Sequence, residues 1–272
     1  MKKLVFDIGM HVGNDTNYYL KKGFKVVAVE ANKNLVAKAN SRFKENISNK
    51  DLTIIDKAIS EINSGEIDFY INNSKDDWGT IFPEWNRSLN NDFSKIKVET
   101  ASLKDIIDEH GMPYYIKIDI EGADIICLKS LIGYKELPKF ISIELPTPNN
   151  FKNENPLEII TLLSELGYKK FKISDQSINW SKKNMNPPKE GTFVNIKFDG
   201  HSSGPFGNEL EGKFYSLDEI SAAFLKNYYN PSPFDIFYEF KIKLNYYLKM
   251  NIFKMENKFH KNGWFDLHAY LD

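Results

Sequence analysis

The sequence predicts an α/β fold in which a mostly parallel sheet carries helices on both faces. First, short β-branched runs alternate with helical segments over the first half of the chain, and such alternation is typical of parallel sheets. Second, Gly23 and Gly167 follow two of the helical segments, where glycine commonly ends a helix. Third, 272 residues with 42% hydrophobic side chains suffice for one large α/β domain with an added segment.

Seven strands are expected in the main sheet. The apolar and β-branched runs that predict them lie at residues 4–8, 25–30, 52–55, 115–119, 140–144, 168–174 and 192–198. The alternating residues 66–71 are typical of an antiparallel edge strand. Start signals predict helices from Asn14, after the capping residues Asn32 and Ser102, near Asp124 and at Pro156.

The chain changes character after Asp199. Residues 200–213 are rich in Gly, Pro and Ser, and Ser216 with Glu219 forms a capping box that opens another predicted helix. Residues 234–259 then carry aromatic and aliphatic side chains nearly all round a helix, on a lysine-rich background.

This change suggests two parts. Residues 1–200 are expected to form the core, and residues 201–272 a substrate loop with an aromatic-rich helical C-terminal extension. Because the extension has no clean basic face, we expect it to pack on the core or at a homodimer interface rather than on a membrane surface.

Composition excludes several classes of protein. With 36 basic and 37 acidic residues the net charge is -1, so no nucleic-acid partner is expected. A single cysteine, Cys127, rules out a disulfide framework and a cysteine-based zinc site. No apolar run approaches the roughly 20 residues of a membrane span. Since an acid already stands at Asp7, there is no room for a signal peptide, and we expect a cytoplasmic protein.

Acidic residues end several of the predicted strands. In a parallel sheet the carboxyl ends of the strands share one edge, and ligands bind there. A single acid at such a place is equally well explained as a turn or helix cap. Several on one edge indicate a site; they are Asp7, Glu30, Asp119, Glu144 and Asp199.

The first turn at this edge suits a nucleoside. Gly9 and Gly13 let the backbone turn tightly, but a dinucleotide fingerprint fails because His11 and Asn14 stand where its later glycines belong. Glu30, ending the second strand, can accept hydrogen bonds from both ribose hydroxyls. A glycine turn with a ribose acid and no phosphate loop indicates a ligand without pyrophosphate, such as S-adenosylmethionine.

Three stretches carry a family resemblance. They are residues 7–16 (Asp-Ile-Gly-Met-His-Val-Gly-Asn-Asp-Thr), residues 27–32, and residues 116–124 (Ile-Lys-Ile-Asp-Ile-Glu-Gly-Ala-Asp) with 142–144 after them. Over about residues 4–170 the sequence resembles the FkbM family of S-adenosylmethionine-dependent methyltransferases. The resemblance implies a Rossmann-like class I methyltransferase with sheet order 3-2-1-4-5-7-6, the last strand antiparallel. The sequence departs from the family pattern at His11, where the family often has Asn, and at Lys33, where the family often has Pro.

The resemblance also assigns cofactor residues. It places Asp7, Gly9 and Gly13 along the methionine part of S-adenosylmethionine, with His11 in the same turn. Asp15 and Thr16 cap the helix beneath it, and Glu30, followed by Ala31, holds the ribose. The adenine falls next to Asp56, Lys57 and Ala58.

The expected reaction is methyl transfer to a hydroxyl of a sugar, either nucleotide-linked or within a surface polysaccharide. The hydroxyl must lose its proton, so a base or a metal is needed. Asp119, Glu121, Glu144 and His201 are the candidate catalytic residues. One hypothesis is Mg or Mn bound by Asp119, Glu144, Asp199 and His201; the other is a metal-free site in which His201 is the base.

Substrate contacts are expected from Trp78, Asp199 and Ser203. Two other functions stay open at this point. A nicotinamide-dependent oxidoreductase could use the same kind of sheet, although the glycine spacing counts against it. A non-catalytic nucleoside-binding scaffold would leave the acids Asp119, Glu121 and Glu144 without a role.

Overall fold

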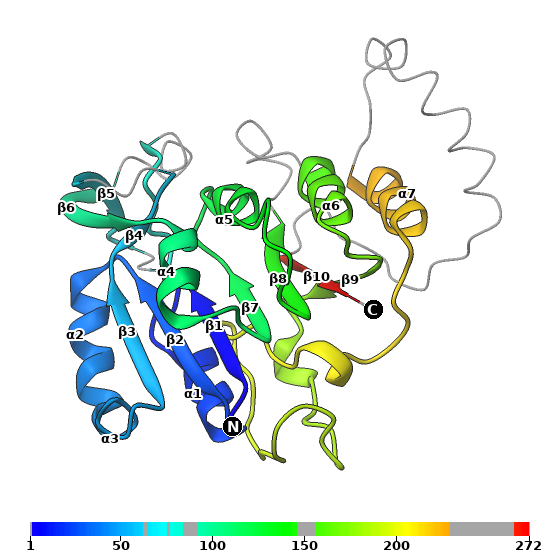
Figure 1. Ribbon diagram of the computed structural model, residues 1–272, viewed down its shortest axis with the longest axis horizontal. Helices are drawn as coiled ribbons and strands as arrows, with labels where there is room; N and C mark the ends of the chain where they lie inside the picture. Colours follow the sequence, from blue (N-terminus) through cyan, green and yellow to red (C-terminus); the bar gives the residue numbers. More distant parts are fainter. Residues whose placement is uncertain are drawn as a thin grey trace, which may run out of the picture.

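A computed structural model describes residues 2–61, 65–74, 77–83, 92–145, 156–228 and 264–271 (Figure 1). Its centre is a seven-stranded sheet formed by β1 (Leu4–Ile8), β2 (Lys25–Glu30), β3 (Leu52–Asp56), β7 (Tyr115–Ile118), β8 (Phe140–Leu145), β9 (Lys170–Asp175) and β10 (Phe265–Tyr270). The spatial order is β3-β2-β1-β7-β8-β10-β9. Counted within this sheet the order is 3-2-1-4-5-7-6, which confirms the expected Rossmann-like methyltransferase topology.

The last strand of the sheet comes from a different segment than expected. β10, red in Figure 1, lies between β8 and β9 and runs antiparallel to both. Residues 192–198, expected as this strand, form no strand. Their alternation has another cause, because Val194, Ile196 and Phe198 pack against the hydrophobic cluster beside α1. The expected core of residues 1–200 is therefore completed by a strand at the far end of the chain.

A smaller three-stranded sheet holds β4 (Ala58–Ile59), β6 (Phe93–Ala101) and β5 (Glu66–Asn72), in that order. The expected edge strand at residues 66–71 is present as β5 and is antiparallel, but its partner is β6 rather than a strand of the main sheet. β6 was not expected from the sequence.

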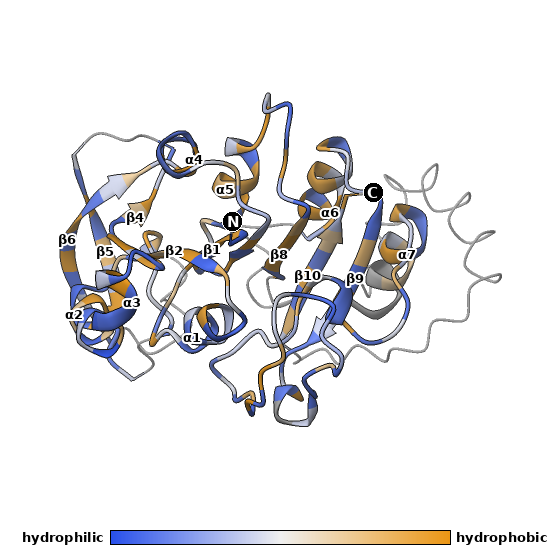
Figure 2. Ribbon diagram, turned by 60° about the horizontal axis from the view of Figure 1, so that its bottom comes forward, coloured by the Kyte–Doolittle hydropathy of each residue, from blue (hydrophilic) through white to orange (hydrophobic). Residues whose placement is uncertain are grey.

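Helices cover both faces of the large sheet. One face is covered by α4 (Leu103–His110), α5 (Asp124–Ser130), α6 (Pro156–Glu165) and α7 (Leu217–Tyr228). The other face carries α1 (Asn14–Lys21) and α2 (Lys33–Arg42), with α3 (Lys44–Ser48) directly after them. Figure 2 shows α1 on the side of the sheet opposite α4 and α5.

The predicted capping residues act as expected. The side chains of Asn32 and Ser102 accept hydrogen bonds from the first-turn amides of α2 and α4. Ser216 and Glu219 exchange backbone-to-side-chain hydrogen bonds at the start of α7. These local signals explain why the helix starts could be found from the sequence.

Part of the predicted C-terminal extension, residues 234–259, lies outside the described residues. Its packing or dimer role stays a prediction. No helix within the described residues is long and apolar enough to cross a bilayer.

Candidate active site

The turn between β1 and α1 brings three strand ends together. The amides of Gly9 and Met10 both donate to the carbonyl of Val29, next to the end of β2. Gly9 has a φ of +85°, and a Cβ there would stand 1.8 Å from the carbonyl oxygen of Asp119. Only glycine fits this approach, so residue 9 sets how closely the turn meets the end of β7.

Glu30 lies under the same turn. Its two carboxylate oxygens accept hydrogen bonds from the amides of His11 and Asn32, both at 2.8 Å. Burial raises the pKa of Glu30 to about 7, although these amides work to lower it. Each carboxylate oxygen can accept more than one hydrogen bond, so the predicted ribose acid keeps acceptor capacity at this position.

A buried lysine joins the acids beneath the turn. The Nζ atom of Lys117 lies 3.6 Å from Asp7, 3.8 Å from Asp15 and 3.3 Å from Asp119, and it donates to the carbonyl of Gly9 at 3.1 Å. Thr16 donates its hydroxyl proton to Asp7. The cluster therefore ties three acids and the glycine turn to one cation.

Burial and charge oppose each other in this cluster. Burial raises the pKa of Asp7, and that of Asp15 to about 6, while Lys117 works to lower both. Burial also works to lower the pKa of Lys117, but Asp119, Asp7 and Asp15 outweigh it and hold that pKa well above its usual value. Lys117 thus remains a cation at the centre of the site. The sequence analysis missed it; its signal was a lysine between two isoleucines of a short buried strand.

Three acids meet beyond Lys117, at the carboxyl ends of β7 and β8. One carboxylate oxygen of each of Asp119, Glu121 and Glu144 lies within 4.8 Å of the others. Burial, with the charges of Glu121 and Asp119, raises the pKa of Glu144 well above its usual value. Glu121 has a φ of +50°, and its carbonyl accepts a hydrogen bond from Thr80 at 2.7 Å. This acid trio can accept a proton or hold a hard divalent cation.

Asp199 and His201 lie apart from the acid trio. Asp199 accepts hydrogen bonds from the Asn14 side chain at 3.1 Å and from the His201 amide at 2.9 Å. The His201 side chain is 53% exposed, with its ring 5.4 Å from that of His11 and its Nδ1 3.8 Å from Asp77. The ligand set expected for a metal is therefore not assembled, and Glu121 takes the place of Asp199 and His201 beside Asp119 and Glu144. The reason is the missing strand at residues 192–198, which was expected to bring Asp199 to the sheet edge.

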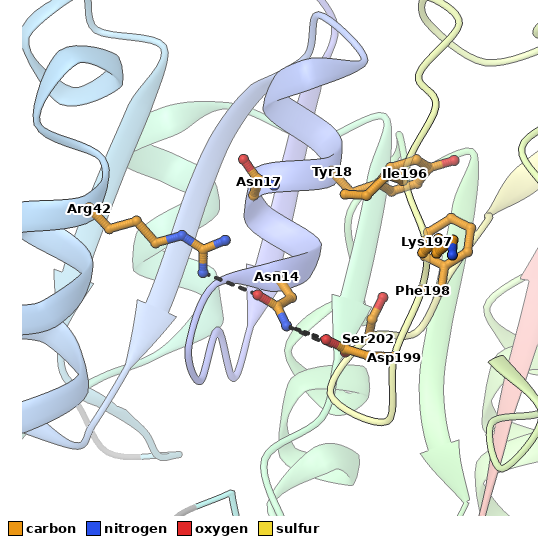
Figure 3. A pocket seen from close by; sticks show the side chains of 9 residues that line it. All are labelled: Asn14, Asn17, Tyr18, Arg42, Ile196, Lys197, Phe198, Asp199 and Ser202. Atoms are coloured by element: carbon orange, nitrogen blue, oxygen red, sulfur yellow. Dashed lines mark hydrogen bonds between the residues drawn. The ribbon is translucent and has the colours of Figure 1, made fainter. Parts of the chain in front are cut away.

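The segment after His201 closes over α1. The amide of Ser203 donates to both oxygens of Asp15, at 3.0 and 2.9 Å, and the hydroxyl of Ser202 donates to the same carboxylate. A pocket of about 140 Å³ opens beside it, lined by Asn14, Asn17, Tyr18, Arg42, Ile196, Lys197, Phe198, Asp199 and Ser202 (Figure 3). Arg42 donates to Asn14, and Asn14 to Asp199, across this pocket.

The remaining predicted residues lie toward the smaller sheet. Asp56 is exposed at the end of β3, Lys57 forms an ion pair with Glu99 at 3.3 Å, and Ala58 is buried in β4. Trp78 is half-buried in the segment before Thr80, the residue that contacts Glu121. Trp78 is thus two residues from a contact with the acid trio, whereas Asp56 and Lys57 lie at the β3 end of the sheet edge.

A comparison with known proteins decides the family. The chain matches the methyltransferase FkbM domain over residues 7–170, more than half of its length. The chain belongs to the FkbM methyltransferase family. With the sheet order above, this makes it an S-adenosylmethionine-dependent methyltransferase. A comparison with curated proteins gave no match.

Several solved structures are similar to this FkbM methyltransferase, each with a TM-score of 0.40. They include a precorrin-6y C5,15-methyltransferase from Geobacter metallireducens GS-15, with 10% identity over 100% of this chain and 81% of that one. A SAM-dependent methyltransferase from Archaeoglobus fulgidus has 12% sequence identity over 99% of this chain and 86% of that one. Phosphoethanolamine N-methyltransferase 2 from Haemonchus contortus, in complex with S-adenosyl-L-methionine, has 11% sequence identity over 100% of this chain and 49% of that one. The family assignment stands on the match over residues 7–170.

Sequence reasoning missed a second buried charged residue of the methyltransferase, this time an acid. Asp266, in β10, lies directly opposite Glu144 of β8 and is 3% exposed. Burial raises the pKa of Asp266 to about 7, and the charge of Asp119 adds to this. The signal that could have found the strand is its alternation, because Phe265, Leu267 and Ala269 alternate with Asp266 and His268.

Proposed function

We propose that this FkbM methyltransferase transfers the methyl group of S-adenosylmethionine to a hydroxyl of a carbohydrate acceptor. The acid trio Asp119, Glu121 and Glu144 carries the proposal, because it stands at the carboxyl edge of the sheet beside the glycine turn. Ligands of such sheets bind at this edge. Carboxylates there can orient a hydroxyl and take up its proton.

The proposed cofactor path follows the same edge. Gly9 and Gly13 let the β1–α1 turn pack closely against Asp119 and Phe43, and we place the methionine part at this turn, with Asp7 held beneath by Lys117. Glu30 accepts hydrogen bonds from the ribose hydroxyls, and Asp56 is the candidate partner of the adenine amino group. The oxygen-rich rim suits a cationic sulfonium better than a pyrophosphate, which argues against the nicotinamide oxidoreductase.

Methyl transfer to oxygen is an in-line displacement, so the residues must align the acceptor and remove its proton. Asp119 and Glu144 stand at neighbouring strand ends where we place that hydroxyl, and burial, with the charges of Glu121 and Asp119, raises the pKa of Glu144. The exposed His201 is not positioned with them, so we place the proton on the acid trio.

The acid trio also fits a divalent metal, since carboxylate oxygens are the ligands that Mg and Mn prefer. Asp119, Glu121 and Glu144 would hold the ion. Bound there, it would lower the pKa of an acceptor hydroxyl and relieve the repulsion among the acids.

The test begins with titration calorimetry of the protein with S-adenosylhomocysteine and, separately, with NAD. We expect the first to bind and the second not to; the reverse would contradict the proposal. Methyl transfer from labelled S-adenosylmethionine is then measured with monosaccharide, nucleotide-sugar, amine and carboxylate acceptors. Transfer only to amines or carboxylates would exclude sugar O-methylation.

The metal question has its own experiment. Purified protein is treated with EDTA, dialysed and assayed with and without Mg or Mn, beside Asp119→Asn and His201→Ala variants. Loss of activity after chelation, with recovery when Mg or Mn is added, supports a metal-dependent reaction. Full activity after chelation, with no metal found by elemental analysis, leaves the carboxylate base; in both cases Asp119→Asn should be far less active than His201→Ala.

A further inference from the structure

Polar side chains continue across the sheet beyond the acid trio. The register of β10 sets Asp266 opposite Glu144 on one side and opposite Ser174 of β9 on the other. Residues opposed in antiparallel strands point to the same face, so these three share the face that carries α1. From Glu144 to Ser174 the row spans two strand spacings, about 10 Å.

Lys182 closes the far end of this row. After β9 the chain turns through a short 3-10 helix, Asn179–Ser181, which returns Lys182 toward the sheet. Its Nζ atom donates to the hydroxyl of Ser174 at 2.8 Å and to the side-chain carbonyl of Gln176 at 3.0 Å. Within the described part of the chain Lys182 has no salt bridge, and burial lowers its pKa to about 8.

Several buried polar atoms around Lys182 lack partners. Gln176 Nε2, Asn179 Oδ1 and His268 Nε2 find no hydrogen bond among the described residues, although their side chains are only 1%, 1% and 3% exposed. An unpaired buried polar atom costs about 1–3 kcal/mol, so folded proteins keep few of them without a reason. Lys182 and Asn179 lie side by side, since a Cβ at Gly204 would meet Lys182 Cδ at 3.2 Å and Asn179 Oδ1 at 3.5 Å.

The row reaches solvent at its ends. Glu144 and Lys182 are partly exposed, while Asp266 between them is buried and hydrogen-bonded to the side chain of Ser203. A ligand that arrives from solvent would therefore meet Glu144 of the acid trio at one end of the row and Lys182 at the other.

We propose that Ser174, Gln176, Lys182 and Asp266 form the subsite that holds the non-reacting hydroxyls of a neutral sugar, whose reacting hydroxyl lies at the acid trio. The inference rests on the proposed function and extends it to a place and a ligand class. The acceptor Asp266 lies between Glu144 and Ser174, and the donors Lys182 and Gln176 lie beyond Ser174, so a sugar can use its hydroxyls as donors toward one end and as acceptors toward the other.

Charge selects against anionic ligands at this subsite. A phosphate or carboxylate would meet one cation, Lys182, but also Asp266 and the acid trio. Because this end of the sheet is rich in carboxylates, a neutral polyol loses less on burial than an anion does. The subsite thus favours a neutral sugar ring over the phosphate of a nucleotide sugar.

The test is saturation-transfer NMR on the whole chain with S-adenosylhomocysteine bound. The probes are the methyl α-glycosides of glucose, galactose, mannose and fucose, with inorganic phosphate as competitor. We expect at least one glycoside to bind and phosphate not to displace it. Binding of none of the four, or competitive displacement by phosphate, overturns the subsite. Loss of S-adenosylhomocysteine binding would instead contradict the proposed function.

Variants locate the glycoside. Lys182→Met removes the ammonium, and Lys183→Met, next to it and exposed, is the matched control. The loss of a charged hydrogen bond should raise the glycoside Kd about tenfold or more in Lys182→Met, with Lys183→Met unchanged. Ser174→Ala is measured as well, so that a folding defect in one variant leaves the other. Unchanged glycoside affinity in a folded Lys182→Met or Ser174→Ala protein overturns the proposal.

Discussion

The two faces of the large sheet are built by the same strands, and both carry apolar clusters, but only the face with α1 also carries buried charged residues from the central strands. On one face Ile116, Ile118, Ile141 and Ile143 pack with α4, α5, α6 and α7 into a dry cluster. On the other, residues one position along the same strands carry charge or hydroxyl: Asp7, Lys117, Ser142, Asp266 and His268. Because strand side chains alternate, one sheet can separate stability from chemistry.

The polar face carries an electrostatic cost that the dry face does not. Burial raises the pKa values of Asp15, Glu30, Glu144 and Asp266, so their ionised forms are less stable in the fold than in the unfolded chain. Lys117 offsets part of this cost. The dry face therefore contributes a stability that does not depend on pH, whereas the stability of the polar face does.

The substitution Lys117→Met is expected to destabilise the polar face most. Asp7 and Asp15 would remain buried, and Asp119 half-buried, without their cation, and we expect the free energy of unfolding to fall by about 3–5 kcal/mol near neutral pH. Protonation of the carboxyls relieves the repulsion, so the gap to wild type should narrow as the pH falls toward about 5. Urea unfolding at two pH values measures this; an equal loss at both would contradict the charge explanation.

The matching change on the dry face is Leu163→Ala in α6. Leu163 is fully buried in the cluster between α6 and the sheet, so the cavity should cost about 2–5 kcal/mol. Because no charge is touched, this loss should be the same at both pH values. Calorimetry should find the affinity for S-adenosylhomocysteine unchanged in the folded variant, and a large drop would mean that the faces are not independent.

The sequence predicted the parts of this comparison that are locally encoded. Each of these parts is determined by a few neighbouring residues. They are the strand runs, the caps Asn32 and Ser102, and the acids at positions 30, 119 and 144. What failed was the assignment of the last strand to residues 192–198, because no strand was expected at residues 265–270. Residues 192–198 and 265–270 both alternate, and only the second pairs with β8 and β9. Alternation reports one buried side, which packing on a helix produces as well as pairing in a sheet.

That single error carried over to the site. Placing a strand at residues 192–198 brought Asp199 and His201 to the sheet edge, so they were grouped with Asp119 and Glu144. With the strand supplied by residues 265–270, Asp266 takes that edge position instead. Lys117 was missed for another reason: its partners Asp7 and Asp15 are over a hundred positions away in sequence and meet it only in the fold.

A milder test of the polar face follows the pKa of Glu30. Below about pH 4.5 this carboxyl is protonated in both states; between there and about 7 only the folded protein keeps the proton. Wild-type stability should therefore fall as the pH rises through about 7, by up to roughly 3 kcal/mol from this group. In Glu30→Gln that part of the pH dependence should disappear, and S-adenosylhomocysteine should bind more weakly. An unaltered stability profile would remove Glu30 as its source.

The smallest effect is expected where a lysine and an acid meet in water. Lys2 and Asp51 form an ion pair at 2.7 Å, shorter than any distance from Lys117 to its acids, but their side chains are 52% and 28% exposed. Water and salt screen such a pair, so Lys2→Met should change the free energy of unfolding by at most about 1 kcal/mol, and by less at high salt. Urea unfolding beside Lys117→Met gives the comparison directly. If both substitutions cost the same, burial would not be what makes the polar face sensitive; we expect the longer, buried contacts to matter more than the shorter, exposed one.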